Sequence, residues 1–341
     1  MKLHLLLTLS LALAVPGAAE ADNPLFASAE PIHLVIQAPI ANLTRNRDVN
    51  STIAGTLTDP AGQRLPISLA LRGITRRTAD TCEFPPLRVS FTAPPPPASV
   101  FAGQKRLKLV THCRNSASFQ QYVLLEYAAY RMANVLGPKS FGVRLATIEY
   151  VGADGRPTLS RVGFFIEDLS DVARRNGTRE AHAPQMIPVT YLSPADSARY
   201  ALFQQMIANH DWSMRAGPPG DDCCHNAKLI GAPAPGMAIP IAYDFDFSGF
   251  VNAPYAEPPP QLRINSVSQR AYRGYCAHNA EALAAAHQFR DAKPQLIAAV
   301  TTVPGLEPRT QQRAIAFLEP FFADIADDQT TSAKILSHCA G

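Results

Sequence analysis

The sequence lacks a strong net charge and, beyond its first residues, any long apolar run. Its 31 lysines and arginines nearly balance its 28 aspartates and glutamates, so the formal charge is +3. This balance supplies neither the basic surface expected for nucleic-acid binding nor an acidic tail. No later segment has the roughly 20 apolar residues that a membrane-spanning helix needs. We therefore expect no nucleic-acid partner and no integral membrane segment in the mature chain.

Common catalytic and metal-binding motifs are also missing. The chain contains no GxSxG, HExxH or Walker motif, and it has no CxxC pair. These absences leave no marked nucleophile elbow, HExxH zinc site or P-loop.

The N-terminus has the pattern of a cleavable export signal. Lys2 precedes an apolar run over residues 5–15, which Pro16-Gly17 ends, and small residues follow at Ala19 and Ala21. A positive start, a short apolar run and a small-x-small site are typical of a secretory signal peptide. We predict cleavage after Ala21 and a periplasmic or secreted mature protein.

Six cysteines are present, and an even number in an exported chain favours disulfide bonds. We expect Cys82 to pair with Cys113, and Cys276 to pair with Cys223 or Cys224. The alternative use of these residues is a zinc site, whose ligands would be Cys223, Cys224, His225 and His278.

The spacing of apolar residues changes along the chain and predicts an α+β protein. Residues 31–112 alternate between apolar and polar with turn clusters between, which is typical of short strands. Helical spacing over 118–136 and 194–209 predicts two helices. Further helices are expected over 277–327 with a break at Pro304, and further strands over 143–151, 161–166, 228–230 and 239–247. The predicted regions are a signal peptide (1–21), a β-rich N-terminal region (22–112), a core with the catalytic and metal-binding loops (113–276) and a helical C-terminal region (277–341).

Polar residues suited to phosphoryl transfer follow the second of these helices. Asp211 lies just after it, and Asn226 precedes a short predicted strand. Asp244 and Asp246 lie two residues apart on another predicted strand, so both carboxylates would face the same side. Phosphoryl transfer needs a carboxylate to accept the proton of the nucleophile, and Asp and Asn side chains to hold Mg²⁺. We predict Asp211 as the base, and as ligands of Mg²⁺ (or Mn²⁺) Asn226, Asp244 and Asp246.

Two upstream residues complete this pattern. Lys108 lies on a predicted strand and Glu126 lies on the helix that follows it. A strand lysine paired with a helix glutamate is how kinases hold the phosphates of ATP. We therefore predict that Lys108 and Glu126 bind the nucleotide, with an unknown protein or small molecule as acceptor.

Residues 72–249 resemble the CotH kinase-like proteins, a family of secreted atypical kinases. The residues that carry the resemblance are Leu71-Arg72-Gly73, Arg106 to Leu109, Glu126 on a helix ending at Leu136-Gly137, Arg144 to Val151, Phe164 to Asp168, Asn209 to Trp212, Asn226 and Tyr243 to Asp246. The resemblance implies a bilobed protein-kinase-like fold with a β-rich N-terminal part and a helical C-terminal part. It also implies ATP with a divalent ion, and transfer to protein serines in the secretory route.

The sequence departs from ordinary kinases in three ways. Asp211 and Asn226 are fifteen residues apart, GxGxxG is absent, and Asp-Phe-Asp stands where Asp-Phe-Gly is usual. Two alternatives therefore stay open. One is a non-catalytic secreted metal-binding or envelope-associated protein, and the other is a metal-dependent phosphohydrolase that uses the same carboxylates. A bacterial periplasm contains little ATP, so an exported kinase there would need nucleotide from another source or another phosphoryl donor, unless it has no catalytic activity.

Overall fold

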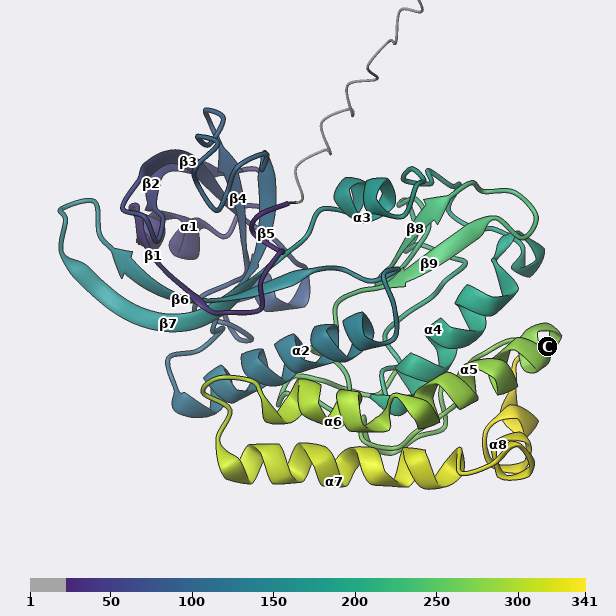
Figure 1. The fold of residues 1–341 in the computed structure, drawn as a ribbon. Helices are drawn as coiled ribbons and strands as arrows, with labels where there is room; N and C mark the ends of the chain where they lie inside the picture. Colours follow the sequence, from purple (N-terminus) through teal and green to yellow (C-terminus); the bar gives the residue numbers. More distant parts are fainter. Residues whose placement is uncertain (1–22) are drawn as a thin grey trace, which may run out of the picture.

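The structure, a computed structural model, describes residues 23–341, so the predicted signal peptide lies outside the described residues. Figure 1 shows a barrel of strands beside a group of helices. The strands are β1 (Ile32–Gln37), β2 (Thr52–Thr58), β3 (Arg64–Leu71), β4 (Leu87–Phe91), β5 (Arg106–Val110), β6 (Val143–Val151), β7 (Pro157–Ile166), β8 (Ala227–Gly231) and β9 (Ala238–Ala242). The helices are α1 (Ile40–Asn46), α2 (Ala117–Val135), α3 (Leu169–Arg175), α4 (Pro194–Met206), α5 (Asn279–Asp291), α6 (Lys293–Thr301), α7 (Pro308–Asp324) and α8 (Asp328–Lys334), with short 3-10 turns η1 (Thr75–Arg77), η2 (Val189–Tyr191), η3 (Cys276–His278) and η4 (Leu336–His338).

Strands β1 to β7 close into a mixed barrel in the order β1-β2-β3-β4-β5-β7-β6. Neighbouring strands are antiparallel except for β1 and β6, whose parallel pairing closes the ring from Ile32↔Ala146 to Gln37↔Val151. A second, two-stranded sheet joins β8 to β9. Closure leaves the barrel without an exposed edge strand.

The expected bilobed protein-kinase-like fold, with a β-rich N-terminal part and a helical C-terminal part, is wrong. A closed seven-stranded mixed barrel with helices beside it takes its place. The strands expected after the first long helix return to the barrel, where β6 pairs with β1 and β7 pairs with β5. The order of elements does not reveal this closure, because pairing between β1 and β6 joins segments that are far apart in the sequence.

Helix α2 packs against the outside of β6 and β7 and contacts α6, and α7 packs against α6 (Figure 1). Along β5, Leu107 and Leu109 belong to the apolar core inside the barrel, whereas Val110 belongs to the core around the helices. Side chains alternate along a strand. Lys108 therefore shares with Val110 the face of β5 that looks away from the barrel interior.

Several local predictions are confirmed. Helices α2 and α4 lie where the apolar spacing placed them, and the chain breaks around Pro304 between α6 and α7. Helix α4 begins at Pro194 after Ser193, whose hydroxyl donates to Asp196 at 2.7 Å instead of capping a backbone group. The strand expected over 239–247 is too long, because β9 ends at Ala242.

Three disulfides link the described cysteines. The expected pairing of Cys82 with Cys113 is confirmed. The expected pairing of Cys276 with Cys223 or Cys224 is wrong, because Cys276 bonds to Cys339, and Cys223 bonds to Cys224. The alternative zinc site is also wrong, because Cys223 and Cys224 form a disulfide and offer no thiolate to a metal ion. Disulfides are compatible with an oxidising compartment, and within residues 23–341 no helix has the length and apolar character to cross a bilayer.

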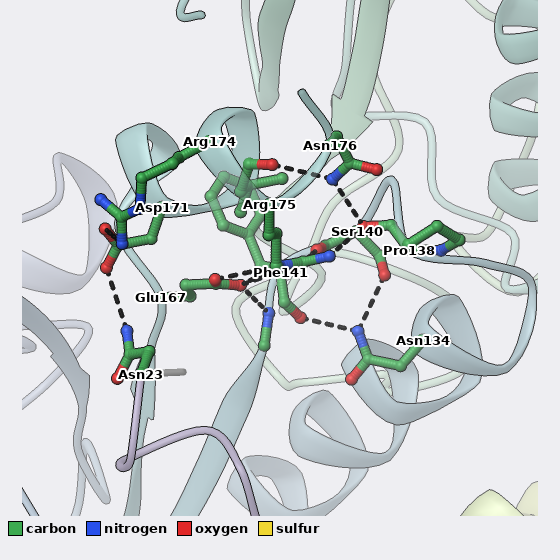
Figure 2. A network of polar contacts seen from close by, with 12 residues as sticks. Asn23, Asn134, Pro138, Ser140, Phe141, Glu167, Asp171, Arg174, Arg175 and Asn176 are labelled. Carbon is green, nitrogen blue, oxygen red and sulfur yellow. Dashed lines mark hydrogen bonds and ion pairs between the residues drawn. The ribbon is translucent and has the colours of Figure 1, made fainter. Parts of the chain in front are cut away.

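A polar network fixes the loop between α2 and β6 (Figure 2). The guanidinium of Arg175 forms an ion pair with Glu167 at 3.0 Å and donates to the carbonyls of Pro138 and Ser140. Asn134 adds a bond of 2.8 Å to the carbonyl of Phe141. Because Glu167 follows β7 and Arg175 ends α3, the network holds the loop, and with it Phe141, at a fixed distance from the barrel.

Candidate functional site

An acidic cluster forms where α2 meets the segment after β9. Glu126, Asp244 and Asp246 each offer one carboxylate oxygen, and these oxygens all lie within 4.8 Å of one another. Glu126 is buried in the middle of α2, while the side chain of Asp244 is 32% exposed. The two aspartates leave the strand after Ala242, but their carboxylates still converge as the sequence led us to expect.

Arg76, from η1, holds the three carboxylates of the acidic cluster together. Its Nη1 lies 3.1 Å from Glu126 Oε2, its Nε lies 3.1 Å from Asp246 Oδ2, and its Nη2 lies 3.5 Å from Asp244 Oδ1. Its side chain is 8% exposed, so these contacts are largely screened from water. One guanidinium thus faces three carboxyl groups.

The acidic cluster is short of positive charge and of hydrogen-bond donors. Burial raises the pKa of Glu126 and, more strongly, that of Asp246, although Arg76 opposes both shifts. Glu126 Oε1 is buried and has no hydrogen-bond partner within the described residues. Carboxylate oxygens at this spacing are the ligands that Mg²⁺ and Mn²⁺ prefer. The residues therefore fit a divalent cation, which would supply the missing charge and take the unpaired oxygen.

Two cations, Lys108 and Arg72, lie beside this acidic cluster, and neither forms an ion pair with a carboxylate within residues 23–341. Lys108 Nζ lies 4.9 Å from the ring centre of Tyr243 and 5.5 Å from that of Phe141. Arg72 donates a hydrogen bond to the Tyr243 hydroxyl. Burial and then the charge of Arg72 lower the pKa of Lys108 to about 8, with Asp168 and Asp244 opposing. A phosphate group at this point would supply the missing negative charge.

Asp211 forms a second centre with two residues that follow the vicinal disulfide. Asp211 Oδ1 accepts a hydrogen bond from His225 Nε2 at 2.7 Å, and Oδ2 accepts one from Asn226 Nδ2 at 2.9 Å. Asn226 Nδ2 also donates to the Asp211 carbonyl at 2.7 Å. The Asp211 side chain is 34% exposed, so its remaining lone pairs face an accessible region. The carboxylate is thus oriented by its neighbours and still reachable.

Asp244 connects these groups electrostatically. The hydrogen bond to Asp211 is the main cause that raises the pKa of His225, and the charge of Asp244 adds to it. The negative charge of Asp244 also favours a higher pKa for Lys108, for Arg72 and for Glu126 in the acidic cluster. Asp244 and Asn226 adopt left-handed backbone conformations, with φ of 62° and 45°. Such conformations outside glycine concentrate at functional sites, although Asp and Asn adopt them more readily than most residues.

The structure alters two of the predicted roles. Glu126 pairs with Arg76, not with Lys108, so the expected lysine–glutamate pair is not formed. Asn226 bonds to Asp211, which leaves its amide oxygen as the atom available to a cation. Asp244 and Asp246 meet Glu126 in the acidic cluster, whereas Asp211 belongs to a separate group with His225 and Asn226.

Sequence reasoning missed Arg76 and Tyr243 as parts of this site. Arg76 lies in the run Thr75-Arg76-Arg77, where nothing in the sequence distinguishes the buried arginine from its neighbour. Tyr243 stands directly before Asp244, and its place in that motif was the available signal. No protein-family model matches the chain, and no curated protein matches it, so the likeness to the CotH proteins stays a prediction.

Proposed function

We propose that this chain is an exported phosphotransferase that binds ATP with Mg²⁺ or Mn²⁺ and transfers a phosphoryl group to a hydroxyl of a protein or small acceptor. The observation that carries the proposal is the position of Asp244. Its carboxylate belongs to the acidic cluster, and its negative charge also interacts electrostatically with Lys108, with Arg72 and with His225 of the Asp211–His225 pair. A cation site and an anion site next to each other are what a metal-bound nucleotide requires.

Each group has a role in this proposal. Glu126, Asp244 and Asp246, with the amide oxygen of Asn226, would hold the cation, which would neutralise charge on the phosphates. Lys108 and Arg72 bind phosphate oxygens. The carboxylate of Asp211 accepts the proton of the acceptor hydroxyl as that oxygen attacks the γ-phosphorus of ATP and ADP leaves with the bridging oxygen. Its bonds to His225 and Asn226 keep the carboxylate oriented.

The second candidate is a non-catalytic secreted protein in which the acidic cluster is structural or binds a metal ion alone. Arg76 favours it, because this guanidinium already contacts all three carboxylates. A buried cation that compensates buried acids is a common structural arrangement. The two candidates differ in whether a nucleotide binds.

Thermal unfolding of the exported chain separates them. Wild type, Asp244→Ala and Asp154→Ala are heated with Mg²⁺ or Mn²⁺ alone, with a non-hydrolysable ATP analogue alone, and with both. Asp154 is an exposed aspartate in the β6–β7 turn and serves as the matched control. We expect metal and nucleotide together to raise the melting temperature of wild type and of Asp154→Ala, and not that of Asp244→Ala.

The other outcomes are also informative. Stabilisation by metal without any effect of nucleotide supports the non-catalytic candidate. Release of phosphate from ATP without an acceptor points to a metal-dependent phosphohydrolase. If no combination of metal and nucleotide shifts the wild-type transition, the proposed phosphotransferase is wrong.

A further inference from the structure

A cavity of about 550 Å³ opens on the barrel, away from the acidic cluster. Its walls come from three segments: the start of α1, the stretch around Phe84 with His112, and the β6–β7 turn with Tyr150 and Leu159. This volume lies within the range of about 300–1,000 Å³ that small-molecule sites occupy. None of the residues assigned above to metal, nucleotide or acceptor lines it.

The walls of this cavity are rigidly built. The Cys82–Cys113 disulfide ties the segment before Phe84 to the residue after His112. Phe84 N donates to the Cys113 carbonyl at 2.8 Å, and Thr111 Oγ1 donates to the Phe84 carbonyl at 3.0 Å. A cavity whose walls are cross-linked in this way is pre-formed, so a ligand would not have to order it.

Three aromatic rings form one side of the cavity. The ring centre of Phe84 lies 4.5 Å from that of His112 and 4.7 Å from that of Tyr150. The rings are tilted against one another, by 37° between Phe84 and His112 and by 56° between Phe84 and Tyr150, so they form an angled aromatic wall. Such a surface suits a planar aromatic group, which packs against rings by offset or edge contact.

His112 carries a polar atom that the protein leaves unpaired. The residue is 2% exposed, and its Nδ1 is buried with no hydrogen-bond partner within residues 23–341. Burial and then the charge of Arg161 lower the pKa of His112 to about 4, so the ring is neutral near pH 7. Leaving a buried nitrogen unsatisfied costs about 1–3 kcal/mol. His112 lines the cavity, and a ligand that hydrogen-bonds to Nδ1 itself would recover part of that cost.

The charges around the cavity restrict its ligand further. Glu83 and Asp154 line it and are exposed, and no lysine or arginine of the described chain is among its lining residues. Carboxylates at the rim disfavour an anionic ligand, and the apolar interior disfavours any buried charge. We propose that this cavity is a second binding site, for an uncharged planar aromatic molecule with one hydrogen-bonding group that meets His112.

The test uses N-phenylnaphthylamine, an uncharged aromatic amine whose fluorescence rises in apolar surroundings. It is titrated into the full exported chain and into variants Ala41→Trp, Ala153→Trp and His112→Phe. Ala41 and Ala153 line the cavity and are exposed, so tryptophan there blocks the opening without entering a packed core. Ile74→Ser and Met237→Ser remove exposed apolar side chains elsewhere and serve as controls.

We expect saturable one-to-one binding to wild type and to both controls. Either tryptophan should weaken binding at least about tenfold, the equivalent of 1.4 kcal/mol. His112→Phe should also weaken binding while its melting temperature stays equal or rises, because the unpaired nitrogen is gone. The proposal is overturned if wild type does not bind, if the tryptophan variants bind as wild type does, or if the two serine controls abolish binding.

Discussion

Replacement of Lys108 by methionine tests the anion site most directly. Lys108 Nζ lies over the rings of Tyr243 and Phe141, and within residues 23–341 it forms no ion pair. Methionine keeps the length and most of the apolar stem while removing the charge. We expect Lys108→Met to unfold at a higher urea concentration than wild type at pH 7 and to lose nucleotide binding.

The magnitude follows from the lowered pKa of Lys108. A shift from 10.5 to about 8 corresponds to about 3 kcal/mol of unfavourable charge burial near pH 7. Loss of the attraction between the ammonium and the Tyr243 ring offsets about 0.5–1 kcal/mol of this. The expected gain in the free energy of unfolding is therefore on the order of 2 kcal/mol.

The pH dependence gives the sign of the effect. The folded-state pKa of Lys108 lies below its unfolded value, so its contribution to stability is complete above about 10.5 and is lost as the pH falls through about 8. Wild type should therefore approach Lys108→Met in stability as the pH rises from 8 to 10.5. The assay is urea unfolding at pH 7 and pH 10, with nucleotide affinity measured in parallel.

Lys105→Met provides the matched control, since Lys105 is exposed just before β5. It should change neither stability nor nucleotide affinity. A Lys108→Met protein that is less stable than wild type at pH 7, or whose advantage is the same at both pH values, would refute the burial argument. A variant that gains stability but still binds nucleotide would refute the assignment of Lys108 to the phosphates.

Three further predictions concern the cluster, the base and the loop network. Arg76→Met should lower the free energy of unfolding by about 3–5 kcal/mol, because it leaves buried carboxylates without a compensating cation. Loss of the cation raises the folded-state pKa of these carboxyl groups, so the loss of stability should become smaller as the pH falls. Urea unfolding between pH 5 and pH 8 measures this. Asp211→Asn should reduce phosphoryl transfer by a factor of about 10²–10⁴ and leave the melting temperature within about 1–2 °C, since the side chain is 34% exposed. Arg175→Met should cost about 2–4 kcal/mol, because Glu167 is 3% exposed and loses its cationic partner, keeping only the hydrogen bond from Gly142 N (Figure 2).

Each of these predictions has an outcome that contradicts it. Near-wild-type stability of Arg76→Met would mean that the three carboxylates need no cation in the folded state. Full transfer activity in Asp211→Asn would remove this residue as the base. An Arg175→Met protein as stable as wild type would show that the backbone, and not the network, positions Phe141.

Local features of the chain were readable from sequence because they depend on neighbouring residues. Helical spacing of apolar side chains marks α2 and α4, and the turn of the chain at Pro304 separates α6 from α7. Asp244 and Asp246 converge as expected, but not for the expected reason, because they lie beyond the end of β9 and the alternation of strand side chains does not apply to them. The Cys82–Cys113 bond was predictable as well.

Long-range pairings were not readable in this way. The likeness of the element order to that of kinases led to a wrong fold, since nothing local shows that β6 returns to pair with β1 and close a barrel. The partners of Cys276 and of Glu126 also depend on which distant segments meet. Arg76 reaches Glu126 because η1 lies over the middle of α2, whereas Arg77 carries the same charge and is not placed there.

The chemistry of the individual side chains is thus a property of the sequence, while their partners are a property of the fold. Carboxylates at 211, 244 and 246 and a lysine at 108 suit phosphoryl transfer wherever the chain brings them. Burial and the charge of Arg72 lower the pKa of Lys108, while Glu126 pairs with Arg76 instead of with this lysine. Electrostatic free energy depends on distance and on desolvation, and both arise only when segments remote in sequence pack together.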